Sequence, residues 1–133
     1  MNKTFLGCGA ALGLLAVILG ALGAHALKAH LGAAALESFR TGVAYQMYHA
    51  LFLLLLGGSG RLGELAGKAV GYLVLSGILL FSFSIYALTL APLAGMDLGA
   101  IGWVTPLGGL LMISGWSLLI YRVIRSPRKQ EIR

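Results

Sequence analysis

The chain has 133 residues, of which 59% are hydrophobic and only 11% are charged, and its formal net charge is +6. This composition is too apolar for a water-soluble domain of the same size. The positive charge could suggest a nucleic-acid partner, but the Lys and Arg residues flank long apolar runs. Positive residues in that position determine membrane topology, so the sequence predicts a protein of the lipid bilayer that does not bind nucleic acid.

Charged residues divide the chain into four intervals, each long enough for one transmembrane helix. The intervals hold 24, 20, 28 and 24 residues without Lys, Arg, Asp or Glu, and they are bounded by Lys3, Lys28, Arg40, Arg61, Lys68, Asp97 and Arg122. About 20 apolar residues in a helix cross the hydrocarbon core of a bilayer. We therefore predict one all-α domain over residues 1–133, an antiparallel bundle of four transmembrane helices with spans at about residues 4–27, 42–58, 69–91 and 101–121.

The first span could also be a secretory signal, because Ala24-His25-Ala26 follows it like a small-residue cleavage site. The apolar run of residues 4–24 is longer than the 7 to 15 residues of a typical signal core. We therefore expect this helix to be retained.

The distribution of positive residues predicts the orientation. With four spans, one side of the membrane carries Lys3, Arg61, Lys68, Arg122, Arg125, Arg128, Lys129 and Arg133, and the other side carries only Lys28 and Arg40. Lys and Arg are enriched in cytoplasmic loops. The sequence thus predicts a bacterial inner-membrane protein of the plasma membrane with both termini in the cytoplasm and residues 122–133 as a basic cytoplasmic tail.

The second helix is expected to begin near Ala33 as a short amphipathic external segment, to enter the membrane around Val43 and to end at the Gly57-Gly58-Ser59-Gly60 breaker. The third span carries hydroxyl groups that can bond to carbonyl groups or to neighbouring helices, on Ser76, Ser82, Ser84, Tyr86 and Thr89. In the fourth, Trp103 suits one membrane interface, and Trp116 with Tyr121 suits the aromatic belt at the other.

Small residues recur at helical spacing and predict sites of close helix packing. They are Gly9, Gly13, Ala16, Gly20 and Ala24 in the first span and Gly102, Gly108, Gly109 and Gly115 in the fourth. The neighbouring helix could come from the same chain or from a second copy.

Polar side chains are concentrated in residues 25–49. This segment contains all three histidines of the chain, His25, His30 and His49, together with Glu37, Arg40 and Gln46. Glu37, Thr41, Tyr45 and His49 follow one another at four-residue spacing. In a helix they form a polar stripe, which we expect to face the interior of the bundle or a hydrated external vestibule. A local ion pair between Glu37 and Arg40 is a further option, three residues apart.

His49 is the deepest titratable side chain, and it has two interpretations. It could handle protons, bind a ligand or hold a cofactor, or it could be a structural histidine bonded to Tyr45, Gln46 or a carbonyl group. The three histidines lack zinc spacing and no haem-attachment motif is present, so we expect no metal and no cofactor. The sequence also contains no catalytic motif, which indicates a protein that is not an enzyme.

Three stretches resemble a known family: residues 20–28 (GALGAHALK), 39–51 (FRTGVAYQMYHAL) and 102–109 (GWVTPLGG). Nearly the whole chain resembles the domain-of-unknown-function 423 family, also called uncharacterised protein family 0382, which comprises small bacterial inner-membrane proteins related to eukaryotic transmembrane protein 256. The resemblance implies topology rather than chemistry, and its motif positions His25, Tyr45, Gln46, His49, Thr105 and Pro106 are candidates only.

The leading functional hypothesis is a non-enzymatic structural or accessory membrane component, which forms a homo-oligomer or joins a larger membrane complex through its small-residue faces. An alternative is a small transporter or proton-coupled carrier that uses the polar stripe of the second helix. Another is a redox or quinone-associated subunit, which the histidines and tyrosines near one membrane face suggest.

Overall fold

The computed structural model describes residues 1–127, and every regular element within them is a helix. The four long helices are α1 (Lys3–Ala24), α2 (Ala33–Gly58), α3 (Gly60–Leu90) and α4 (Val104–Arg125). Short 3-10 helices at Leu27–Ala29, Ala91–Ala94 and Gly99–Ile101 make the connections at one end. The all-α prediction is confirmed. α4 continues to Arg125, four residues into the predicted tail, and residues 128–133 of that tail lie outside the described residues.

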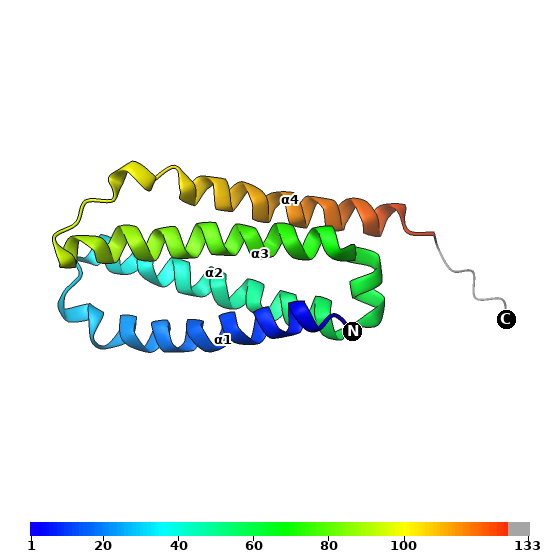
Figure 1. Ribbon diagram of the computed structural model, residues 1–133, viewed down its shortest axis with the longest axis horizontal. Helices are drawn as coiled ribbons and strands as arrows, with labels where there is room; N and C mark the ends of the chain where they lie inside the picture. Colours follow the sequence, from blue (N-terminus) through cyan, green and yellow to red (C-terminus); the bar gives the residue numbers. More distant parts are fainter. Residues whose placement is uncertain (128–133) are drawn as a thin grey trace.

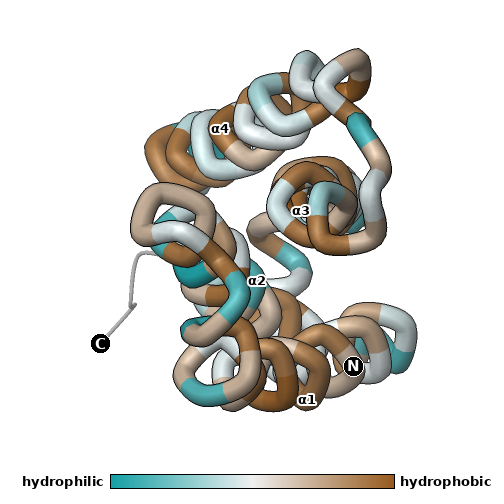
Figure 2. The backbone as a smooth tube through the Cα atoms, turned by 90° about the vertical axis from the view of Figure 1, so that its left-hand side faces the viewer, coloured by the Kyte–Doolittle hydropathy of each residue, from teal (hydrophilic) through white to brown (hydrophobic). Residues whose placement is uncertain are grey.

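Successive helices run in opposite directions and pack in chain order (Figure 1). α1 packs on α2, α2 on α3, and α3 on α4. Figure 2 shows α1 and α4 on opposite sides of the array, with α2 and α3 between them. The arrangement is therefore open, whereas a closed bundle would also pair α1 with α4. Apolar helix faces can remain exposed to lipid tails, which are as apolar as a leucine side chain, so no hydrophobic force requires closure.

The end of the molecule that holds the N-terminus is built by capping residues. The Asn2 side chain accepts hydrogen bonds from the backbone N–H groups of Thr4 and Phe5. The backbone N–H of Asn2 donates to the Gly57 carbonyl oxygen at 2.9 Å. Ser59 alone links α2 to α3, and its hydroxyl caps α3 by accepting from Leu62 N–H. The predicted breaker after α2 is confirmed, and it makes a very tight turn.

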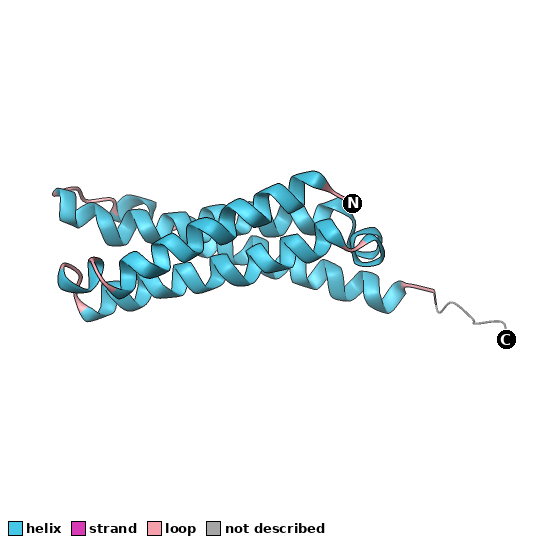
Figure 3. Ribbon diagram, turned by 90° about the horizontal axis from the view of Figure 1, so that it is seen from below, coloured by secondary structure: helices cyan, strands magenta, loops and turns pink. Residues whose placement is uncertain are grey.

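α3 is kinked at Gly67, whose φ of 64° and ψ of 170° interrupt the helix. Residues 60–66 turn away from the axis of the rest of α3, and they are seen nearly end-on in Figure 3. Such a positive φ suits glycine, which has no Cβ. The Arg122 guanidinium donates to the Ala66 carbonyl group next to the kink, so α4 holds the short segment in place.

Glycines allow the helices to approach closely, but not all the predicted ones contribute. A Cβ added to Gly9 would lie 2.8 Å from the Ala50 carbonyl oxygen, and one added to Gly115 would lie 2.8 Å from a Val74 methyl carbon. At Gly13, Gly20 and Gly109 an added Cβ would make only ordinary contacts, of 3.5 to 3.9 Å. The tight glycine contacts thus use helices of the same chain, and Ala24 is exposed.

Three segments are long and apolar enough to cross a membrane: Lys3–Ala29, Gly60–Ala94 and Gly99–Arg125. α2, with 26 residues, is long enough but is not among them, because polar side chains such as Gln46 and His49 lower the hydropathy of its sequence. Yet α2 packs against both α1 and α3, and its residues Phe39, Gln46, Ala50 and Leu53 are fully buried. Its polar side chains therefore have to be examined in their surroundings.

Candidate functional site

Gln46 is the most completely buried polar side chain of α2, with no exposed surface. Its amide Nε2 donates to the Leu12 carbonyl oxygen of α1 at 2.8 Å. Its Oε1 accepts from the Tyr86 hydroxyl of α3 at 2.7 Å. One side chain therefore connects three helices. Leaving it unpaired in the core would be costly, so these hydrogen bonds specify the relative positions of the helices.

A second buried hydrogen bond joins α2 to α3. The Ser82 hydroxyl of α3 donates to the Gly42 carbonyl oxygen of α2 at 2.7 Å, and both residues are buried. The helices are close at this point, since a Cβ added to Gly42 would lie 3.0 Å from a carbon of the Tyr86 ring. Ser82 and Gln46 thus form one polar contact region between the middle parts of α2 and α3.

His49 connects α2 to α4. Its Nδ1 lies 2.8 Å from the Tyr45 carbonyl oxygen, which can only accept, so Nδ1 carries the proton. Its Nε2 accepts from the Trp116 indole N–H at 3.1 Å. The Trp116 ring also stacks on Phe52, with 4.5 Å between the ring centroids. Each ring nitrogen of a neutral His49 therefore has a hydrogen-bond partner within the chain, which agrees with the structural interpretation of this residue.

The hydroxyls of α3 mostly serve structure, as the sequence predicted. Ser76 and Thr89 donate to carbonyl groups of their own helix. Ser84 bonds to the Thr105 hydroxyl of α4 at 2.6 Å, which ties the start of α4 to α3. Within residues 1–127, every buried side-chain nitrogen or oxygen has a hydrogen-bond partner.

The predicted polar stripe does not form a single buried face. Glu37, Thr41 and Tyr45 are exposed, and only His49 is buried. Each four-residue step advances about 40° beyond a full turn, so Glu37 and His49 differ by about 120° around the helix. The first part of the stripe therefore does not face the interior, which leaves the external vestibule as the option for Glu37 and Thr41, whereas Gln46, which lies outside the stripe, is buried together with His49.

The other candidates do not converge with His49. His25 ends α1 by donating its backbone N–H to the Ala21 carbonyl group, and its side chain is exposed, as are His30 and Arg40. No ion pair joins Glu37 to Arg40. Among residues 1–127, no three His, Cys, Asp or Glu side chains lie together in a way that could hold a metal ion.

A groove of about 590 Å³ lies between α2, α3 and the start of α4, at the end of the molecule with the 3-10 connections. Small residues of α2 line one wall, at Gly32, Ala35 and Ser38. Of the candidate residues, Thr41 and Thr105 line it, and Phe81 of α3 is a further lining residue. The Tyr45 ring packs on Phe81 with 5.2 Å between the ring centroids, and His49 does not line the groove.

Two features of this region, the Trp116–His49 contact and the groove, are not predicted from the sequence. The sequence predicts Trp116 in an aromatic belt but does not indicate that its N–H donates to His49. The groove was also missed, although the three-residue spacing of Gly32, Ala35 and Ser38 is a signal that could have indicated a small-residue face. Neither feature follows from the sequence alone, because each depends on which residues of helices distant in the sequence come into contact.

These features define an α-helical membrane protein whose polar core side chains connect its own helices. The family model described as "Protein of unknown function (DUF423)" matches residues 19–109, and the chain belongs to this family. No solved structure matches the chain.

Relatives cover nearly the full length. The chain is 39% identical over 118 residues to a UPF0382 membrane protein of Staphylococcus saprophyticus, which covers 89% of this chain and 94% of the relative. It is 36% identical over 127 residues to the UPF0382 membrane protein YwdK of Bacillus subtilis, with 92% and 98% covered. It is 37% identical over 126 residues to a UPF0382 membrane protein of Haemophilus influenzae, with 95% and 98% covered. The resemblance noted in the sequence is thereby confirmed.

Proposed function

We propose that this chain is a non-enzymatic accessory component of the bacterial plasma membrane and that all four helices span the bilayer. α2 is the helix whose composition alone does not indicate a span, and the position of its polar groups supports its place in the bilayer. Gln46 and His49 are buried and bonded to α1, α3 and α4, so they do not face lipid. Polar side chains in a transmembrane helix are tolerated when they point into the protein and find partners there.

The proposed orientation follows from the positive residues, eight of which lie on the side of both termini. Figure 1 places the N-terminus and the end of α4 at the same end of the molecule, with the kinked start of α3. That end would be cytoplasmic.

Reporter fusions test this topology. We expect alkaline phosphatase to be active when it is fused after His30, and inactive when it is fused after Ser59 or after Pro127, because α2 returns the chain to the cytoplasm. A fluorescent protein fused at the same three positions serves as the opposite reporter. Alkaline phosphatase activity after Ser59 would show that α2 does not cross the membrane.

The observation that supports the accessory function is that the buried polar side chains of α2 already have hydrogen-bond partners within the chain. Both nitrogens of His49 and both amide atoms of Gln46 bond within the chain. A proton-coupled carrier would need such a group to be free, and a haem-binding redox subunit would need histidines that converge. His25 and His30 are exposed at one end, and His49 lies in the core. The geometry therefore favours a structural function over both alternatives.

The groove between α2, α3 and α4 is the proposed contact surface. Small residues at Gly32, Ala35 and Ser38 would let the backbone of a further transmembrane helix approach closely. The tight glycine contacts of α1 and α4 are already used within the chain. A helix of a second copy or of a larger membrane complex would therefore pack in this groove.

Photo-crosslinking in native membranes tests the contact. In a chain with Cys8→Ser, a single cysteine is introduced at Ser38 and labelled with a benzophenone maleimide. We expect a discrete adduct, at twice the 13.9 kDa mass of the chain if the partner is a second copy. Glu37→Cys is the matched control, since Glu37 is adjacent and exposed but does not line the groove. Recovery of Ser38→Cys only as a monomer would contradict the proposed association.

A further inference from the structure

We propose that the cleft at the N-terminal end of α1 binds the headgroup of an anionic phospholipid and that Lys3 and Lys68 hold its phosphate. The cleft has a volume of about 510 Å³ and lies at the end of the molecule opposite to the groove. It is lined by the start of α1, the turn between α2 and α3, and the kinked first part of α3. This site is independent of the proposed helix contact.

The cleft exists because the backbone is held open there. The hydrogen bond from Asn2 N–H to the Gly57 carbonyl group attaches α1 to the end of α2. The kink at Gly67 turns residues 60–66 aside, and Arg122 holds that segment from the side of α4. Gly60 and Gly63 in the lining add no side chains to the space that remains.

The charge of the lining suits an anion. Lys3 and Lys68 approach the cleft from α1 and α3, and both are exposed, so their ammonium groups can reach a ligand without a desolvation cost beforehand. Glu64 is the one carboxylate in the lining, which leaves an excess of positive charge. Basic pockets between transmembrane helices on the cytoplasmic side suit anionic lipid headgroups.

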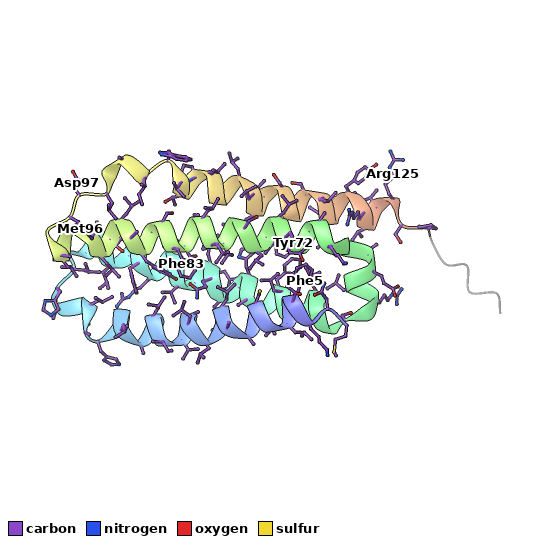
Figure 4. The ribbon with its side chains drawn as sticks, viewed as in Figure 1. Phe5, Tyr72, Phe83, Met96, Asp97 and Arg125 are labelled. Atoms are coloured by element: carbon purple, nitrogen blue, oxygen red, sulfur yellow. The ribbon has the colours of Figure 1, made fainter. Side chains whose placement is uncertain are left out.

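The other side of the cleft is aromatic, which indicates an amphiphile rather than a soluble phosphate. Figure 4 shows Phe5 of α1 and Tyr72 of α3 next to each other. Their rings meet edge to face with 5.2 Å between centroids. Phe5 is buried, whereas Tyr72 is 51% exposed. Tyrosine and lysine together are typical of the membrane–water boundary, where the acyl chains of a bound lipid would lie beside the apolar rings.

Native mass spectrometry of the purified full-length chain, titrated with phosphatidylglycerol or phosphatidylcholine, tests the proposal. We expect bound phosphatidylglycerol to exceed bound phosphatidylcholine. Each lysine replaced in Lys3→Gln and Lys68→Gln should weaken phosphatidylglycerol binding about fivefold, which corresponds to about 1 kcal/mol per positive residue near a membrane surface. Arg61→Gln is the matched control, because Arg61 is an exposed basic residue near the same turn but not in the lining.

A variant expected to gain affinity protects the test against simple misfolding. Glu64→Gln removes the carboxylate from the lining and should strengthen phosphatidylglycerol binding severalfold. Equal binding by the wild type and the double lysine variant would overturn the proposal, as would equal binding of the two lipids. Displacement of the lipid by an equal concentration of inorganic phosphate would also overturn it, since the cleft would then be a site for soluble anions.

Discussion

Replacing Gly108 with alanine is expected to lower the free energy of unfolding by about 2 to 3 kcal/mol, because it forces two helix backbones apart. A Cβ at this position would lie 2.7 Å from the Gly77 carbonyl oxygen and 2.8 Å from the Phe81 Cα. Both are backbone atoms of α3, so no side-chain rotation can relieve the overlap. Reversible unfolding in mixed detergent micelles, followed by tryptophan fluorescence and circular dichroism, measures the change.

The adjacent glycine supplies the control. A Cβ at Gly109 would meet only a Phe81 ring carbon at 3.9 Å. We expect Gly109→Ala to leave stability unchanged or to raise it by up to about 1 kcal/mol, since alanine is the better helix former. Equal destabilisation by the two substitutions would show that α3 and α4 do not cross at Gly108.

Replacing Gln46 with leucine is expected to cost about 2 kcal/mol of unfolding free energy, because it leaves the buried Tyr86 hydroxyl without its acceptor. Tyr86→Phe alone should cost about 1 kcal/mol, in the range measured for hydrogen bonds between transmembrane helices. The double variant should lose less than the sum of the two, since neither polar group then remains unpaired. The same unfolding measurement gives all three values.

Tyr45→Phe is the matched control for this cycle. Tyr45 lies one residue from Gln46 in α2, but it is 41% exposed. Its replacement should change stability by less than about 0.5 kcal/mol. Strict additivity of Gln46→Leu and Tyr86→Phe would contradict a direct bond between the two side chains.

The polar residues of α2 illustrate how a helix can be unsuited to lipid by composition and still suit a membrane protein. Gln46 and His49 lower the hydropathy of α2, yet the Gln46 amide bonds to α1 and α3, and His49 Nε2 accepts a hydrogen bond from α4. Interhelical hydrogen bonds of this kind replace part of the hydrophobic force that is absent between helices in lipid. The open array of four helices is thereby connected from α1 to α4 through α2.

Helix existence was largely predictable from the sequence. The intervals between charged residues predict four helices, and both the Gly57–Gly60 breaker and the late start of the straight part of α3 appear as expected. These features depend on local chemistry: the length of each apolar run compared with the thickness of the bilayer, and the missing side chain of glycine. Each of these features depends only on residues that are close to one another in the sequence.

The candidate site was only partly predictable. The sequence singled out the correct helix, and both Gln46 and His49 were among its candidates, but four-residue spacing alone grouped His49 with Glu37. Small rotations accumulate along a helix, so the residues that face inward depend on where the neighbouring helices lie. Contacts such as Trp116 with His49, separated by 67 positions, could not be deduced from spacing.

The sequence by itself determined that this is a helical membrane protein of the DUF423 family with four long helices. Only the tertiary structure decided that the array is open and that Gln46 is a fully buried polar contact between three helices. It also revealed one groove between α2, α3 and α4 and one basic cleft beside Phe5 and Tyr72. The physical reason is that composition and length fix how well a segment suits lipid, whereas hydrogen bonds and clefts arise where side chains from different helices meet.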